Sequence, residues 1–198
     1  MRKEELRTYI ENHESEMIED LKSLIRIPSE KQAAEPGKPF GAPAAEALAQ
    51  GIEILEKYGF AVTNYDNYAI AADFNQEEKG LDILAHLDVV PAGEGWQETD
   101  PFTPLIKEEK MFGRGTADDK GPAIAAIYAM RAVKELGYPL KKNVRLVLGS
   151  DEECGSSDLE YYYKKEVEAP CTFSPDAEFP VINIEKGGLS VLLSKNTG

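Results

Sequence analysis

Leu81-Asp-Ile-Leu-Ala-His86-Leu87-Asp88 is the stretch that decides the fold of this chain. Residues 81–85 form a short, mostly apolar run that is typical of a buried strand, and the run ends directly in a histidine and an aspartate. Side chains two positions apart on an extended segment point to the same side. Asp88 is therefore placed to accept a hydrogen bond from the His86 ring, as a carboxylate often does behind a metal-binding histidine. The alternative is a polar pair at a strand end without a ligand, which is the commoner case for so short a pattern.

Three further acidic clusters lie where a predicted strand gives way to a loop or a helix. Asp118-Asp119 lies in Phe112-Gly-Arg-Gly-Thr-Ala-Asp-Asp-Lys-Gly121, Asp151-Glu152-Glu153 follows an apolar run, and Asp176 follows a short strand and a proline. In open α/β sheets, sites assemble in the loops beyond the carboxyl ends of strands. Acidic residues are also typical of helix caps and turns, so each cluster alone also fits a structural role. Their common placement is what indicates a metal site.

Glu152 and Glu153 add a possible catalytic group to these ligands. Adjacent side chains of an extended backbone diverge, so one glutamate can bind a metal while the other holds an attacking water. A general base needs a pKa near the working pH, and a nearby cation together with burial can set it. Capping of the following helix is the structural alternative.

The remainder of the chain reads as alternating helices and strands. Helices are expected at residues 4–26, 42–58, 121–137 and 156–165. Strands are expected at residues 60–63 and 68–74, joined as a hairpin across Asp66-Asn67, and at 143–149, 171–174, 181–184 and 189–193. Residues 29–41 read as a surface loop, and the residues between Asp88 and Phe112 as a long loop. This order predicts an α/β fold with a mixed, largely parallel sheet flanked by helices.

The charge and hydropathy of the chain indicate which kinds of molecule it can bind. The 198 residues include 36 acidic and 22 basic side chains, for a net charge of −14. That balance disfavours nucleic acid and is compatible with cation binding, although most of the acids are expected to serve a solvated surface. Cys154 and Cys171 are expected to be reduced thiols. With no secretory signal and no apolar run near the ~20 residues of a membrane span, we expect a cytoplasmic protein without a membrane partner.

The motifs resemble those of the aminoacylase/carboxypeptidase G family of di-zinc metallopeptidases, most closely the PepV-type bacterial dipeptidases. The resemblance rests on His86-Leu-Asp88, Gly113-Arg-Gly-Thr-Ala-Asp118-Asp-Lys-Gly121, Asp151-Glu-Glu153 and Ser174-Pro-Asp176-Ala-Glu178. It covers essentially the whole chain, and the linked motifs are highly specific.

The resemblance implies a role for each site residue. His86 and Asp176 would bind the first metal, with Asp88 orienting His86. Asp118 would bridge both metals, and Glu153 would bind the second. Glu152 would be the general base that activates a water shared by the two metals. A cis peptide bond between Asp118 and Asp119 is also implied.

The chain departs from the family pattern after residue 187. No histidine follows His86, although the family's second metal needs one, and the lid domain is missing. We therefore expect residues 1–187 to be the N-terminal part of the catalytic domain, residues 188–198 to begin the lid, and this piece alone to have little or no activity.

Two other functions stay open at this point. An N-acyl-amino-acid deacylase of the same family would carry out the same amide hydrolysis, and a non-catalytic metal-binding domain would keep the ligands without needing Glu152. The sequence leaves undecided which dipeptide is cleaved, whether Zn²⁺ is replaced by Mn²⁺ or Co²⁺, and the oligomeric state.

Overall fold

The computed structural model describes residues 2–177, 182 and 194–195 of the chain. The strands predicted at 181–184 and 189–193, and the domain boundary predicted near residue 187, rest on residues outside this described part.

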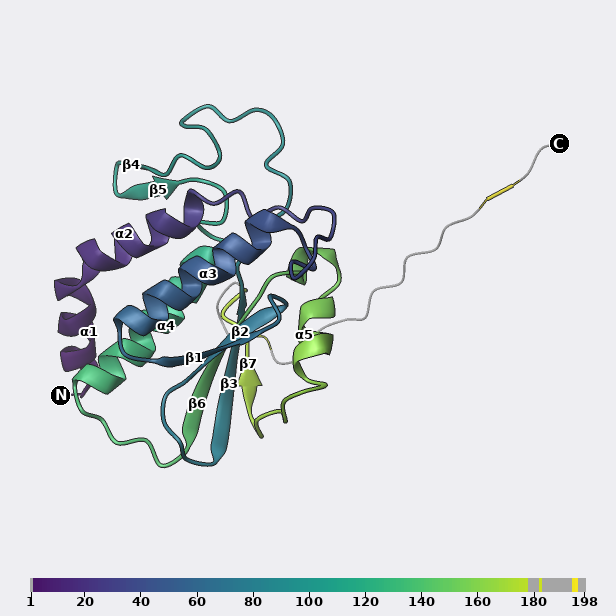
Figure 1. Cartoon of the computed structure of the whole chain (residues 1–198). Helices are drawn as coiled ribbons and strands as arrows, with labels where there is room; N and C mark the ends of the chain where they lie inside the picture. Colours follow the sequence, from purple (N-terminus) through teal and green to yellow (C-terminus); the bar gives the residue numbers. More distant parts are fainter. Residues whose placement is uncertain (1, 178–181, 183–193, 196–198) are drawn as a thin grey trace.

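A five-stranded mixed sheet forms the centre of the molecule (Figure 1). Its strands lie in the order β1-β2-β6-β3-β7. The first two strands pair antiparallel, β2 and β6 also pair antiparallel, and β3 lies parallel to both β6 and β7. The strand bounds are β1 Ala61–Tyr65, β2 Ala69–Asp73, β3 Lys79–His86, β6 Asn143–Gly149 and β7 Thr172–Phe173. The predicted mixed sheet is confirmed, with two parallel and two antiparallel pairings among the described strands.

Helices cover both faces of this sheet (Figure 1). Alternate residues of β2 and β6, such as Ile70 and Leu148, pack in the main core together with residues of α2, α3 and α4. The intervening residues, such as Ala71 and Val147, pack with Tyr162 of α5 in a second cluster. The helix bounds are α1 Arg2–Asn12, α2 Glu14–Ile25, α3 Ala42–Lys57, α4 Lys120–Glu135 and α5 Ser157–Tyr162. The period-2 alternation of the strands thus places one apolar surface on each side of the sheet.

The register of the two central strands positions the site. His86 at the end of β3 is the parallel partner of Gly149 at the end of β6, so the residues that follow these two strands emerge at one edge of the sheet. Gly149 fits there because a Cβ atom would clash with the carboxylate of Asp158, which accepts the N–H groups of Ser150 and Asp151. A short 3₁₀ turn at Glu152–Cys154 follows β6 directly.

One helix prediction was wrong. The helix predicted over residues 4–26 is two helices that meet at His13, whose backbone N–H bonds the carbonyl of Ile10 and whose ring Nδ1 lies 2.7 Å from the carbonyl oxygen of Tyr9. The ring therefore competes for a carbonyl that a continuous helix would use. Residues 29–41 form the predicted loop, which is exposed over residues 31–37 and buries Ser29 and Phe40 near its ends.

The hairpin of β4 (Leu105–Lys107) and β5 (Lys110–Phe112) lies within the segment predicted as a long loop. Its turn residues, Glu108 and Glu109, adopt φ values of 52° and 61°. Glutamate is an unusual choice for this left-handed conformation, which favours Gly, Asn and Asp. The hairpin could therefore not be predicted from its turn residues. Asp66-Asn67 between β1 and β2, which also have positive φ values, are typical turn residues and were predicted as such.

Candidate metal centre

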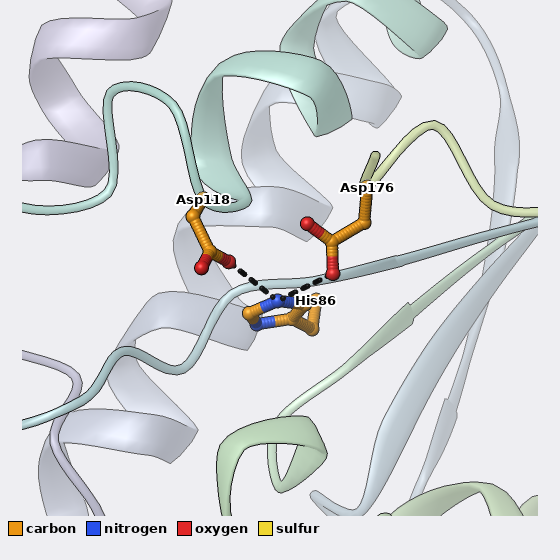
Figure 2. Close-up of side chains that lie close together, drawn as sticks. All are labelled: His86, Asp118 and Asp176. Atoms are coloured by element: carbon orange, nitrogen blue, oxygen red, sulfur yellow. Dashed lines mark hydrogen bonds and ion pairs between the residues drawn. The ribbon is translucent and has the colours of Figure 1, made fainter. Parts of the chain in front are cut away.

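Three side chains from distant parts of the sequence converge on one point (Figure 2). His86 comes from the end of β3, Asp118 from the loop before α4, and Asp176 from the segment after β7. The His86 Nε2 atom lies 3.1 Å from Oδ1 of Asp118 and 3.4 Å from Oδ2 of Asp176. His86 is buried, whereas the Asp118 side chain is 63% exposed. The candidate ligands therefore meet at a place that solvent and substrate can reach from one side.

The other ring nitrogen of His86, Nδ1, contacts Asp88. Nδ1 of His86 lies 3.0 Å from the main-chain oxygen of Asp88 and 3.4 Å from its carboxylate. The Asp88 carboxylate itself accepts backbone N–H bonds from Glu152 (3.2 Å) and Glu153 (3.1 Å). Asp88 therefore lies beside Nδ1 of His86, but its main-chain oxygen makes the closer contact that the sequence predicts for the carboxylate. The carboxylate instead ties the end of β3 to the turn that carries both glutamates.

The two glutamates lie at the rim of the same centre. Oε2 of Glu152 is 3.8 Å from Nε2 of His86. Burial raises the pKa of Glu152, an effect that the charge of His86 opposes and the carboxylates of Asp176, Asp88 and Asp118 reinforce.

The structure does not group Glu153 with the first three ligands. Within the described part of the chain, His86, Asp118 and Asp176 are the residues whose ligand atoms all lie within 4.8 Å of one another. Burial raises the pKa of Glu153, and Asp118 is the charge that adds most to this rise. The charge of Asp118 thus acts on Glu153, while the role of Glu153 as a ligand of a second metal stays a prediction.

The donor set fits a divalent cation. Burial would lower the pKa of His86, but the hydrogen bond with Asp88 and the charges of Asp88, Asp119 and Asp176 outweigh it and raise the pKa to about 10. One imidazole thus faces the carboxylates of Asp88, Asp118, Glu152 and Asp176. Imidazole and carboxylate are the ligand types that Zn²⁺ and related ions take in proteins.

Asp119 is a site residue whose place the sequence did not reveal. It is fully buried, and its Oδ2 accepts the backbone N–H of His86 at 3.0 Å. Its Oδ1 has no hydrogen-bond partner among the described residues, and burial raises its pKa to about 7. Asp119 occupies the N-cap position of α4 without making a side-chain cap. The predicted cis bond between Asp118 and Asp119 is confirmed.

A cavity of about 170 Å³ opens beside His86 and Asp176. Its lining combines apolar side chains with the candidate catalytic group, including Leu84, Leu159, Ser174 and Glu152. A small side chain of a bound molecule would fit next to the metal ligands.

Among the described residues, the helices are all too short or too polar to cross a lipid bilayer.

Comparison with known proteins places the chain in a family. The model of peptidase family M20/M25/M40 matches residues 83–193. The chain is 42% identical to the Beta-Ala-Xaa dipeptidase of Lactobacillus delbrueckii subsp. lactis over 86% of its own length, and 41% identical to YtjP of Bacillus subtilis (strain 168) over 87%. It spans 37% of the length of each of these two relatives.

Solved structures agree with this assignment. Human carnosine dipeptidase 1 superposes with a TM-score of 0.74 at 28% identity, over 86% of this chain and 40% of that one. The dipeptidase Dug1p from Saccharomyces cerevisiae gives a TM-score of 0.69 at 25% identity, over 84% of this chain and 38% of that one. The matched region contains His86, Asp118, Glu152, Glu153 and Asp176, and the chain belongs to peptidase family M20/M25/M40.

Proposed function

We propose that this chain supplies the metal-binding and proton-transferring part of a zinc-dependent dipeptidase. The observation that carries the proposal is the convergence of His86, Asp118 and Asp176 on one point, with Glu152 at its rim. The relatives support the substrate class, since one is named a Beta-Ala-Xaa dipeptidase and the superposed human structure is a carnosine dipeptidase.

The residues that would hold the metals follow from the arrangement of donors. His86, Asp118 and Asp176 would hold the first zinc ion, and Asp118 and Glu153 would hold a second. The second site would also need a further ligand, which is not a histidine of this chain, because His13 is the one other histidine and it stacks on Tyr9 of α1. Bound zinc would supply a Lewis acid that polarises the scissile carbonyl group and lowers the pKa of water. Mn²⁺ and Co²⁺ are alternatives for the same ligands.

Glu152 would move the protons of the reaction. A raised pKa suits a carboxylate that takes a proton from the attacking water and gives it to the leaving amine. Asp88 would keep this base in place, because its carboxylate binds the N–H groups of Glu152 and Glu153 while its main-chain oxygen fixes the His86 ring. The tautomer that this contact favours leaves Nε2 free to bind a metal.

The test uses a protein of the relatives' full length that begins with this chain. We expect it to hydrolyse dipeptides, to lose activity on treatment with a chelator, and to regain it with Zn²⁺. Acylated amino acids should be cleaved more slowly; the reverse order would favour an N-acyl-amino-acid deacylase. Zinc binding without turnover of either substrate class would favour a non-catalytic metal-binding domain.

The 198-residue chain allows a separate test of the first metal site. We expect it to bind one zinc ion in a calorimetric titration, with little or no peptidase activity. The variant His86→Ala should lose this binding, whereas His13→Ala should keep it. Equal zinc affinity in the two variants would contradict the proposed ligand set.

A further inference from the structure

The segment Ile27–Lys31, between α2 and α3, contacts three of the four parts of the chain that carry residues of the metal centre: the end of β3, the start of α4 and the turn after β6. Lys120, which follows the Asp118-Asp119 pair, donates from Nζ to the carbonyl oxygens of Leu24 (2.9 Å) and Ile27 (2.8 Å). These bonds fasten the start of the segment to the loop that carries Asp118.

The middle of the segment is fastened to the end of β3. The Ser29 hydroxyl donates to the carbonyl oxygen of Leu87 at 2.6 Å, and the Ser29 carbonyl accepts the N–H of Val89 at 3.3 Å. Leu87 lies between His86 and Asp88. Ser29 therefore binds the backbone directly beside His86 and Asp88 through two hydrogen bonds.

The end of the segment reaches the third loop through an ion pair. Nζ of Lys31 lies 2.6 Å from Oδ1 of Asp151, whose side chain is completely buried while that of Lys31 is 37% exposed. Asp151 Oδ2 accepts bonds from the hydroxyl and N–H of Ser157. Asp151 directly precedes Glu152, and its carbonyl oxygen accepts the N–H groups of Cys154 and Ser156. Asp151 thus anchors both ends of the turn that holds the two glutamates.

A buried carboxylate needs this cation. Without Lys31, Asp151 would keep only the donors of Ser157, and a buried charge that loses its partner is strongly unfavourable. The turn would relax by moving the Asp151 side chain toward solvent. This movement would loosen Glu152 and Glu153 relative to His86, and displacements of about 1 Å in a catalytic group are known to lower rates greatly.

We propose that Lys31 is a positioning residue for Glu152 and Glu153, acting through its ion pair with the buried Asp151. Its catalytic consequence rests on the proposed function, but its effect on the turn does not. Ile27–Lys31 then supports the parts of the metal centre that carry His86, Asp118 and the two glutamates, through Ser29, the carbonyl group of Ile27 and Lys31 respectively.

The first experiment measures how well the turn is protected from hydrogen exchange in the 198-residue chain. Hydrogen exchange of the amides of residues 150–156 is compared for the wild type, Lys31→Met and Lys31→Arg. We expect the methionine variant to exchange about 10-fold faster at Glu152 and Glu153, whose N–H groups bind Asp88. Arginine keeps the positive charge and should stay within about twofold of the wild type.

Lys57→Met is the matched control. Lys57 is also half-exposed and bonds a largely buried aspartate, Asp20, at 2.9 Å, but this pair joins α3 to α2 away from the metal centre. A general loss of stability would affect both methionine variants. A role in positioning predicts faster exchange at residues 150–156 in Lys31→Met alone.

The second experiment measures turnover in the protein of full length. We expect Lys31→Met to lower kcat about 10-fold with KM changed less than about twofold, and Lys31→Arg to restore kcat. Unchanged exchange in Lys31→Met, the same change in Lys57→Met, or failure of arginine to restore exchange would each overturn the proposal. Absence of dipeptide turnover in the wild type, with the exchange result intact, would overturn the proposed function and leave Lys31 as a support of the turn.

Discussion

Strand β6 connects two polar clusters that differ in how their charges are balanced. On the α5 face, the buried Arg145 bonds Asp73 (2.9 Å), Glu166 (3.1 Å) and Tyr162 (2.8 Å), and Lys79 bonds Glu166 at 2.6 Å. Two cations thus meet two carboxylates. At the end of the strand, the metal centre gathers four carboxylates around one imidazole, those of Asp88, Asp118, Glu152 and Asp176.

The difference separates a structural cluster from a functional one. Around Arg145, each charge finds its opposite within the chain, as buried charges must if the fold is to tolerate them. Around His86, the side chains alone leave an excess of negative charge. The fold tolerates this excess because the rim is open to solvent at Asp118 and because a divalent cation would neutralise it.

Replacement of Glu152 by glutamine should give the largest effect of the changes considered, a loss of turnover that originates at the metal centre. The variant keeps the shape of the side chain but cannot take a proton. We expect kcat of the full-length protein to fall about 10²- to 10⁴-fold, while the affinity of the 198-residue chain for its first zinc ion changes less than about threefold. Steady-state kinetics and calorimetry check the two parts.

Glu160→Gln, on the exposed surface of α5, is the control for Glu152→Gln. It should leave both kcat and zinc affinity unchanged. Wild-type turnover in the Glu152→Gln variant would contradict the role of Glu152 as general base. Glu152 would then be an acidic residue that caps the following helix.

Arg145→Met should lower the stability of the fold and leave the metal centre unaffected. Methionine fills much of the space but leaves Asp73 and Glu166 without their shared partner, and breaking a buried ion pair in this way costs about 3 kcal/mol. Urea denaturation of the 198-residue chain should show this loss, with zinc affinity unchanged. A parallel fall in zinc affinity would show that the two clusters act as one network through β6.

The sequence alone predicted the metal centre better than the cluster at Arg145. His86-Leu-Asp88, Asp118, Glu152 and Asp176 each follow a strand or precede a helix, and the parallel pairing of β3 with β6 brings such positions together at one edge. The cluster at Arg145 depends on the contact of β2, β6 and the segment after α5. An alternating strand with an inward arginine gives no local sign of which acids will meet it.

Similar reasons explain the residues that were misplaced. Asp119 could be read as a helix cap, because nothing in Asp118-Asp119 says which carboxylate points inward. Ser29 and Lys31 lie in a polar, proline-flanked stretch typical of a surface loop. Their partners, Leu87 and Asp151, are distant in sequence, so their importance becomes visible only when the three loops are seen together.

The smallest expected effect concerns the pH dependence of the balanced cluster. Burial would raise the pKa of Glu166, but hydrogen bonds from Lys79, Tyr65 and Arg145 outweigh it and lower the pKa from 4.5 to about 2. A carboxyl group with a lowered pKa in the folded state stabilises the protein above its unfolded pKa. This stabilisation is present above about pH 4.5 and is lost as the pH falls toward 2.

Glu166→Gln should therefore be less stable than the wild type at pH 6 and should lose less of its stability between pH 5 and pH 3. The Glu166 side chain is 26% exposed, so solvent screening reduces the difference to the order of 1 kcal/mol. Urea denaturation at each pH measures it, with the exposed Glu160→Gln as the control. A wild type and a Glu166→Gln variant with the same pH profile would mean that acid instability originates among the crowded carboxylates of the metal centre and not at Arg145. In that case, added zinc should shift the profile at pH 5, where it can still compete with protons for the ligands.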